Sequence, residues 1–250
     1  MDTYKINEVK IDVPASINEM QSVIRKLIDK DKSLISFINP EIFLLAEKDK
    51  GLRNYLSHTA YNFVDGIGLL IAINRVYKDK VYLVTDRYPG TDFFTYLSDD
   101  ILWRIFLFGA SYENNKLASE LIPKKYKNVK IVGNLHGYTK YSDDEIIEKI
   151  NQCNPDILIV CLGFPRQEQW IEKNVNKLNA KIIFGNGGSI DFWSGNIKRA
   201  PKFYIMHRIE WIYRLFQDFN TNRIKRQMRL VTFAKNIIFN KYRIERQTML

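Results

Sequence analysis

The hydrophobic and polar positions of the chain fall into two alternating patterns. Short, mostly apolar runs of strand length occupy residues 34–38, 103–108, 129–132, 156–161 and 181–184. Segments with helical periodicity occupy residues 16–30, 112–121, 142–153 and 166–178. This alternation predicts an α/β fold with a largely parallel sheet covered by helices on both faces. Ligands of such sheets bind beyond the carboxyl ends of the strands, so the loops after Ile38, Phe108, Val160 and Phe184 are candidate sites.

The pattern changes at Pro201. Apolar residues recur at helical spacing up to Phe216, with arginines and lysines between them. Residues 198–250 contain 13 Lys and Arg against 3 Asp and Glu, so this segment carries all of the chain's net charge of +10. Cationic, aromatic, amphipathic helices are typical of segments that lie on a membrane surface. The alternative is a terminal helix pair packed on the core, with its lysines in water.

We therefore divide the chain into an α/β domain, residues 1–200, which contains the candidate loops, and a basic helical appendage, residues 201–250. The distal cations Lys241, Arg243 and Arg246 should face anionic lipid, because each cation near such a surface contributes about 1 kcal/mol.

Composition narrows the setting of the protein. A chain of 250 residues with 46% hydrophobic residues can bury a full core. Cys153 and Cys161 lack the spacing of a metal site and are interpreted as reduced, buried thiols. The first residues lack an apolar signal region, and no stretch approaches about 20 uncharged apolar residues. We expect a cytoplasmic protein that is peripheral on the inner face of the cell membrane.

Two motifs in the first third of the chain combine polar and turn-forming residues. Asn39-Pro40 follows a predicted strand, where Asn either caps a helix or holds a sugar hydroxyl. Asp65-Gly66-Ile67-Gly68 precedes an apolar helix, so Asp65 is either a turn residue or a general base. This motif is a poor dinucleotide fingerprint because Ile71 stands where the third glycine would be.

Two glycine-containing loops follow later strands. In residues 163–170, glycine and proline precede a cluster of polar side chains at a helix start, where a diphosphate is favoured. In residues 185–195, three glycines can form an anion-binding nest, and Asp191 could bind a ribose or a base edge. The alternative for both is an ordinary flexible turn. The second loop lacks the Lys-Ser/Thr pair of a P-loop.

Several function classes lack their signatures. His58, His136 and His207 show no metal-ligand spacing, and no Asp-x-Asp pair of the kind that often holds a metal–nucleotide complex appears, so we expect no metal and no other cofactor. A nucleotide-sugar epimerase or dehydrogenase would need a convincing dinucleotide fingerprint. A nucleic-acid-binding module that uses the basic tail is the main rival, but it leaves the glycine loops unexplained and lacks a recognisable reading helix.

The motifs taken together, in this order, resemble the WecG/TagA/CpsF glycosyltransferases, glycosyltransferase family 26, over roughly residues 10–226. The matching blocks are Asn39–Glu41, Asp65–Gly68, Leu162–Ile171, Gly185–Gly195, Lys198–Pro201 and Glu210–Leu215. The resemblance implies a Rossmann-like sheet with a C-terminal helical appendage. It also implies inverting transfer from a UDP-sugar, of the N-acetylmannosamine or glucose type, to an undecaprenyl-diphosphate-linked sugar in the synthesis of teichoic acid, capsule or exopolysaccharide.

The resemblance also assigns roles to residues. Asp65 would be the catalytic base, with Asn39 beside it. Arg214 would reach over the site from the appendage. The remaining substrate-binding positions implied are Arg87, Gly109, Gly163, Gln167, Glu168, Gly187, Asp191, Arg223 and Arg226. Phe37 and Val64 replace the family's usual Thr and Pro, and Arg223 and Arg226 arrive about two residues late.

The partners implied are the UDP-sugar, the polyprenyl-diphosphate-linked acceptor and an anionic membrane surface. No nucleic acid is expected, and a homo-oligomer is compatible with the sequence. The donor sugar, the acceptor sugar and the polymer are left open.

Overall fold

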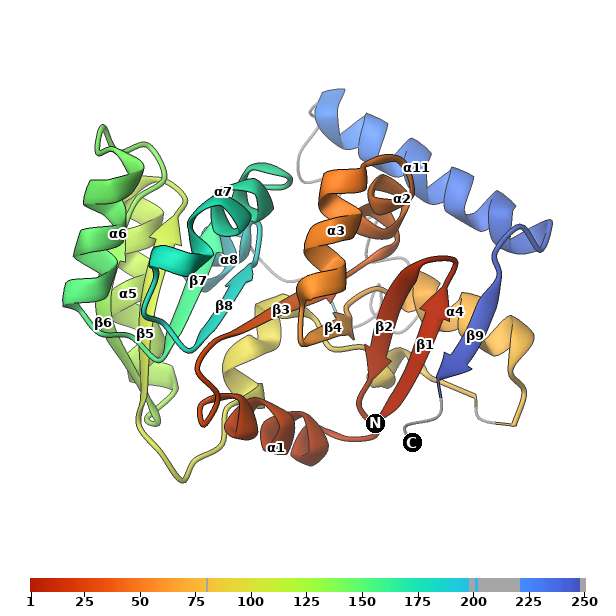
Figure 1. Cartoon of the computed structure of the whole chain (residues 1–250), viewed down its shortest axis with the longest axis horizontal. Helices are drawn as coiled ribbons and strands as arrows, with labels where there is room; N and C mark the ends of the chain where they lie inside the picture. Colours follow the sequence, from red (N-terminus) through yellow and green to blue (C-terminus); the bar gives the residue numbers. More distant parts are fainter. Residues whose placement is uncertain (80, 198–200, 202–220, 248–250) are drawn as a thin grey trace.

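The computed structural model describes residues 1–79, 81–197, 201 and 221–247. Within these residues the chain forms one nine-stranded sheet in the order β6-β5-β7-β8-β3-β4-β2-β1-β9 (Figure 1). Every pairing from β6 to β2 is parallel, whereas β1 pairs antiparallel with both β2 and β9. The strands are β1 (Asp2–Ile6), β2 (Val9–Val13), β3 (Ser33–Ile38), β4 (Tyr61–Val64), β5 (Trp103–Gly109), β6 (Val129–Leu135), β7 (Ile157–Cys161), β8 (Ile182–Gly185) and β9 (Ile244–Gln247).

Helices cover both faces of this sheet, as predicted. On one face α3 packs against α7, and on the other α5 packs against α8. The helices are α1 (Ile17–Leu27), α2 (Pro40–Lys48), α3 (Lys50–His58), α4 (Ile67–Val76), α5 (Tyr112–Lys125), α6 (Asp143–Gln152), α7 (Arg166–Asn174), α8 (Ser189–Trp193) and α11 (Thr221–Ile238), with 3-10 turns η1 (Val84–Asp86), η2 (Gly90–Tyr96) and η3 (Val175–Lys177). The fold is the predicted α/β class.

Local signals explain where several helices begin. The Ser16 side chain accepts the Glu19 N–H at the start of α1. The Glu19 carboxylate accepts the N–H of Ala15, one residue before the position that a capping box would use. At α6 the box is complete, because Ser142 and Glu145 accept each other's backbone N–H groups. Such caps satisfy donors that the helix itself leaves unpaired.

An aromatic cluster fixes the centre of the sheet beneath the candidate site. Phe37 on β3 lies 5.5 Å from Phe184 on β8, and Phe93 of η2 lies 4.5 Å from Phe184, between ring centroids. All three rings are buried. Truncating such a ring costs about 3–5 kcal/mol, so the cluster holds the carboxyl ends of β3 and β8 in a fixed relation.

The C-terminal segment is not purely helical. The prediction placed only basic helices after residue 201, but β9 pairs with β1 and extends the sheet. Arg246, predicted to face lipid, instead bonds the Asp79 carboxylate and stacks over the Tyr77 ring at 4.7 Å. Its charge is therefore neutralised within the fold.

Helix α11 packs on the body of the protein. Phe233 is 3% exposed, and its ring lies 5.7 Å from Phe43 of α2 and 5.2 Å from Tyr242. Arg229 bonds Glu41 of α2 at 2.9 Å. Among the described residues, no helix is both long enough and apolar enough to span a bilayer.

Candidate functional site

The candidate residues come together because five neighbouring parallel strands end at one edge of the sheet. β5 ends at Gly109, β7 leads to Gly163 and β8 leads to Gly187. Next in the sheet, β3 ends before Asn39 and β4 ends before Asp65. The strand β4 was missed by the sequence analysis, which placed Asp65 only at a turn. Asp65 thus lies at a strand end like the other candidates, where α/β sheets bind ligands.

Asn39 is the N-cap of α2. Its Oδ1 accepts the N–H groups of Glu41 and Ile42, each at 3.0 Å. The capping alternative is therefore confirmed, and a contact between the Asn39 side-chain NH₂ and a sugar hydroxyl stays a prediction. Asp65 lies close by, because its N–H donates to the carbonyl of Ile38 at 2.8 Å.

The glycines of the Asp-Gly-Ile-Gly motif let α4 approach α2. A Cβ at Gly66 would overlap Cδ of Pro40, and one at Gly68 would lie 2.7 Å from Cγ of Pro40. Real side chains do not tolerate such contacts, so both positions require glycine. The motif is thus a packing device that brings Asp65 beside Asn39.

Arg87 lies in the segment that runs past the end of β4. The N–H of the next residue, Tyr88, donates to the Val64 carbonyl at 2.7 Å, one residue before Asp65. The structure thus brings the backbone of Arg87 close to the predicted base, and its contact with substrate stays a prediction.

A cavity of about 190 Å³ opens where the two glycine loops meet. Three of the predicted residues line it: Gly163, Gly187 and Asp191. The other lining residues are Ala110, Gly137, Tyr138, Cys161, Leu162, Arg166 and Gly188. We refer to this cavity as the glycine-loop pocket.

Gly163 and Gly187 shape the pocket through their backbone conformation. Their φ angles are +81° and +43°, in the left-handed region that favours glycine. A Cβ at either position would meet nothing within 4 Å, so neither glycine is required by packing. Gly109 differs, because a Cβ there would overlap the Cys161 backbone. We interpret Gly109 as a strand-packing residue next to the pocket.

Asp191 is held in place by a neighbouring helix. Its Oδ1 accepts a hydrogen bond from the side-chain amide of Asn114 on α5 at 2.6 Å. Its Oδ2 lies on the side of Gly188, 3.7 Å from the position that a Cβ on Gly188 would take. Asn114 was not predicted. Asn114 lies in the first turn of α5, where the sequence pattern does not distinguish a polar residue in water from one that contacts the site.

Gln167 and Glu168 begin α7 yet are buried, with exposed fractions of 3% and 7%. Gln167 Nε2 donates to Glu168 Oε1 at 2.8 Å, and Gln167 Oε1 accepts the Gly187 N–H at 2.9 Å. Burial raises the pKa of Glu168 to about 7. The Glu168 carboxyl was predicted to contact substrate, but its link to the pocket runs through Gln167.

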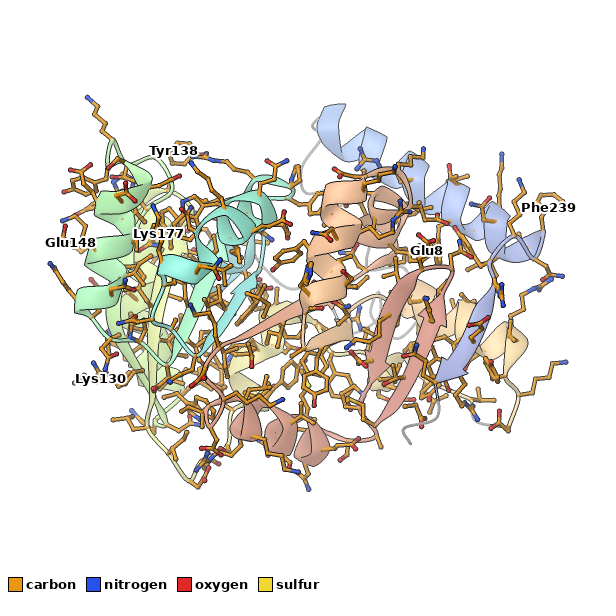
Figure 2. All side chains as sticks on the ribbon, viewed as in Figure 1. Glu8, Lys130, Tyr138, Glu148, Lys177 and Phe239 are labelled. Carbon is orange, nitrogen blue, oxygen red and sulfur yellow. The ribbon has the colours of Figure 1, made fainter. Side chains whose placement is uncertain are left out.

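Tyr138, Gly137 and Arg166 were missing from the predicted site residues. Gly137 follows β6, and its N–H donates to the Ala110 carbonyl at 2.8 Å, which draws the loop over the pocket. Tyr138 projects outward beside it (Figure 2). The sequence signal for this loop was a glycine that follows a strand. It was overlooked because polar residues alternate along β6, so the strand was predicted to end at residue 132 and not at Leu135.

Three predicted arginines belong to the appendage. Arg214 lies outside the described residues. Arg223 and Arg226 lie on the first turns of α11. Their proposed contacts with a diphosphate stay predictions.

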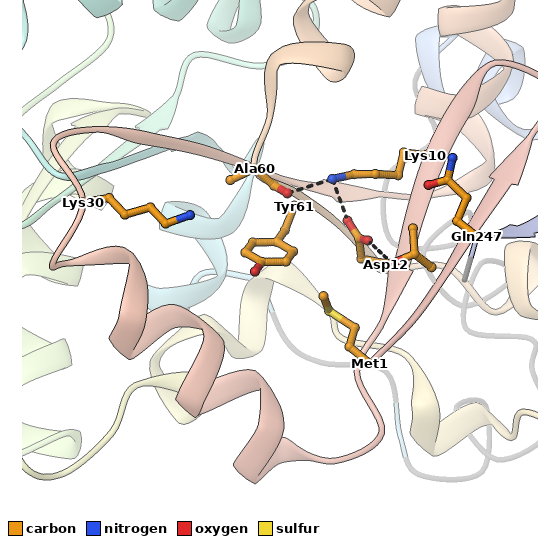
Figure 3. Close-up of a pocket in the computed structure, with 8 residues that line it drawn as sticks. Met1, Lys10, Asp12, Lys30, Ala60, Tyr61 and Gln247 are labelled. Atoms are coloured by element: carbon orange, nitrogen blue, oxygen red, sulfur yellow. Dashed lines mark hydrogen bonds and ion pairs between the residues drawn. The ribbon is translucent and has the colours of Figure 1, made fainter. Parts of the chain in front are cut away.

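A second cavity, of about 650 Å³, lies near the opposite edge of the sheet, where β2 and β4 begin (Figure 3). Its buried carboxylate, Asp12, accepts hydrogen bonds from Thr3 at 2.8 Å and from the Asn62 N–H at 2.8 Å, and pairs with Lys10 at 3.4 Å. These contacts come from the protein itself, so Asp12 ties β1, β2 and β4 together.

Metal ligands were not expected. Within the described residues, no three His, Cys, Asp or Glu side chains are grouped as a metal ion would require. Metal independence of the reaction stays a prediction.

The fold and the site together define a Rossmann-like α/β protein with a cavity between two glycine loops, lined by the carboxylate of Asp191. Comparison with known proteins makes this class specific. The model of the glycosyl transferase WecG/TagA/CpsF family matches residues 4–247. The chain therefore belongs to this family, and it is a glycosyltransferase that transfers a hexose-type sugar.

Two relatives carry the name N-acetylglucosaminyldiphosphoundecaprenol N-acetyl-beta-D-mannosaminyltransferase. The protein of Bacillus subtilis (strain 168) is 34% identical over 210 residues, which cover 82% of this chain and 79% of that protein. The protein of Staphylococcus aureus (strain MRSA252) is 30% identical over 215 residues, which cover 83% and 80%.

Proposed function

We propose that this enzyme transfers a sugar of the N-acetylmannosamine type from a UDP-sugar to a sugar linked to undecaprenyl diphosphate, with inversion. The names of the two relatives support the sugar and the acceptor. The observation that carries the proposal is the arrangement at one sheet edge, where Asn39 lies one strand and Asp65 two strands from the glycine-loop pocket. A glucose-type donor remains the alternative within the same chemistry.

Asp65 acts as the base in this proposal. It removes the proton from the acceptor hydroxyl while the oxygen attacks the anomeric carbon, and the bond to UDP breaks on the opposite side. The leaving diphosphate gains negative charge, which fixed donors and cations at the pocket stabilise. Arg166 lines that pocket, so a guanidinium is available at the leaving-group end of the reaction.

We further propose that the outer end of α11 docks the enzyme on anionic lipid. Ile238 and Phe239 are 61% and 70% exposed, and Figure 2 shows Phe239 at the far end of the molecule. Lys235 and Lys241 flank them and are exposed. Exposed apolar side chains between cations are typical of interfacial binding. We call these four residues the α11 tip. It would keep the enzyme near an acceptor whose lipid stays in the membrane.

The decisive experiment is UDP release with a panel of UDP-sugars and a short-lipid N-acetylglucosamine-diphosphate acceptor. Release with UDP-N-acetylmannosamine that depends on the acceptor is the expected result. UDP release with UDP-glucose but not with UDP-N-acetylmannosamine would show that the glucose-type alternative is correct. Absence of release with every donor, from folded protein presented with the acceptor in anionic vesicles, would refute the proposed reaction.

A further inference from the structure

Gln167 connects the two loops that form the glycine-loop pocket. Its backbone N–H donates to the Gly163 carbonyl at 3.0 Å, and its side-chain Oε1 accepts the Gly187 N–H at 2.9 Å. The side chain lies flat against the end of β8, because a Cβ at Gly185 would lie 2.5 Å from its Nε2. The position of the Gly187 loop therefore depends on which way the Gln167 amide points.

An amide side chain has a donor end and an acceptor end of nearly the same shape. Only the observed orientation presents the carbonyl oxygen to the Gly187 N–H. That orientation turns the NH₂ group toward Glu168 Oε1, which accepts it at 2.8 Å. A carboxylate can only accept, so it enforces this orientation, whereas a neutral carboxylic acid can donate its O–H to a flipped amide. A flipped amide would then point an NH₂ group at the Gly187 N–H.

We propose that Glu168 is a positioning residue, whose carboxylate fixes the Gln167 amide and thereby holds the Gly187 loop in the shape that binds the donor's UDP moiety. This inference rests on the proposed function, because it takes a UDP-sugar as the ligand of the pocket. Glu168 itself does not reach the pocket. Its Oε2 is buried and has no hydrogen-bond partner in the described part of the chain.

The surroundings of Glu168 make its ionisation sensitive to pH near neutrality. Burial raises its pKa to about 7. From α3, the buried Tyr55 hydroxyl has a pKa that is raised mainly by burial and further by the charge of Glu168. One turn on in α7, Glu172 accepts from Asn54. The titratable side chain that β7 and β8 contribute is Cys161, whose pKa burial raises to about 12. Among the described residues, no cation contributes to the pKa of this carboxyl.

The test is the dissociation constant of UDP-N-acetylmannosamine, whose diphosphate has no group that titrates between pH 6 and 8. If only the ionised Glu168 form binds, a pKa of about 7 predicts that wild-type affinity is about tenfold weaker at pH 6 than at pH 8. Glu168→Gln keeps an acceptor but cannot titrate, so its affinity should be independent of pH. Glu168→Met removes the acceptor and should weaken binding about tenfold at pH 8.

Glu172→Gln is the matched control, because it makes the same chemical change on the exposed side of the same helix and should behave as wild type. His136→Gln tests the histidine next to Gly137 and should keep the wild-type pH dependence. Gln167→Ala combined with Glu168→Met should cost no more than Gln167→Ala alone, since Glu168 acts through Gln167.

The outcomes separate two failures. If wild type binds no UDP-sugar, the proposed function is wrong. If wild type binds but Glu168→Gln retains the full pH dependence, or the two losses are additive, the positioning role is wrong. A purely structural role would lower the melting temperature of Glu168→Met without removing the pH dependence in Glu168→Gln.

Discussion

Gly66 and Pro40 are packed so closely that a single methyl group on Gly66 would overlap the proline ring. The contact joins the start of α4 to the start of α2. The predicted base Asp65 and the predicted substrate-binding residue Asn39 each directly precede one partner of the contact. Gly66→Ala should therefore force the two helices apart and destabilise the protein by about 1–3 kcal/mol. Denaturant unfolding measures this loss.

Turnover should fall further in Gly66→Ala than the loss of folded protein explains, because Asp65 moves with α4. Gly51→Ala is the control, because Gly51 is exposed within α3 and should change stability by less than about 1 kcal/mol. Equal behaviour of the two variants would show that the Gly66 contact does not position the site.

Replacing Asp65 should separate chemistry from donor binding. Asp65→Asn keeps the size of the side chain but removes the base, so turnover should fall by about 10² to 10⁴ while the UDP-sugar dissociation constant stays near wild type. Asp49→Asn is a suitable control, because Asp49 caps α3 and Asn caps equally well. Near-normal turnover in Asp65→Asn would remove Asp65 from this role.

Removal of divalent metal should leave the reaction largely intact. The expectation comes from the lack of metal-ligand spacing in the sequence and from Arg166 at the pocket, whose guanidinium can stabilise the leaving diphosphate. The measurement is UDP release before and after treatment with EDTA. Loss of release that Mg²⁺ or Mn²⁺ restores would mean that a metal stabilises the leaving group.

Membrane docking should depend on the α11 tip. Changing Ile238 and Phe239 to Ser should reduce flotation with anionic vesicles, and raised salt should reduce the residual binding. Stability should hardly change, since both side chains are mostly exposed. Leu102→Ser alters an exposed leucine on another part of the molecule and should float as wild type does. Undiminished flotation of the double variant would exclude the tip as the anchor.

Deletion of the tail is a poor test of docking. A chain that ends at Thr221 would lose Phe233 from the core and β9 from the sheet. Such a protein should be less stable for reasons unrelated to lipid, so point variants at the tip are preferred.

Ionisation of the buried Glu168 should also lower the free energy of unfolding as the pH rises. Its pKa is raised from 4.5 to about 7 by burial, so the folded state holds its proton more tightly than the unfolded state does. Stability is therefore unaffected below pH 4.5, decreases between about pH 4.5 and 7, and is constant above that range. The difference of about 2.5 pKa units corresponds to roughly 3 kcal/mol.

Glu168→Gln should abolish that slope, so relative to wild type it gains about 3 kcal/mol between pH 4.5 and pH 8. Denaturant unfolding at the two pH values measures the gain. An unchanged slope in Glu168→Gln would mean that the carboxyl titrates normally in the folded protein.

The sequence predicted the central strands well, because β3, β5, β7 and β8 are nearly continuous apolar runs. It missed β1 and β2 near the start of the chain. It also missed β4, whose four residues include the polar Asn62, and β9, whose residues Ile244–Gln247 are mostly charged or polar. Their pairing depends on neighbours distant in the chain, which local patterns do not contain.

The motifs located the site but not the side chains within it. Gln167 and Glu168 read as polar residues facing a ligand, whereas the structure buries both. The contact between α7 and the Gly187 loop, which are separate in the sequence, shows that Gln167 and Glu168 pack beneath the pocket and hold its loop in place.

The pairing of β9 with β1 has a consequence for how the protein assembles. Thr3 and Gln247 are partners across the sheet although most of the chain separates them. Closing so long a loop is entropically costly, and such contacts tend to form late in folding. The edge strand β9 should therefore be the last to join and the first to exchange its amide hydrogens. Since β9 follows α11 directly, each such opening would also loosen the tip that is proposed to meet the membrane.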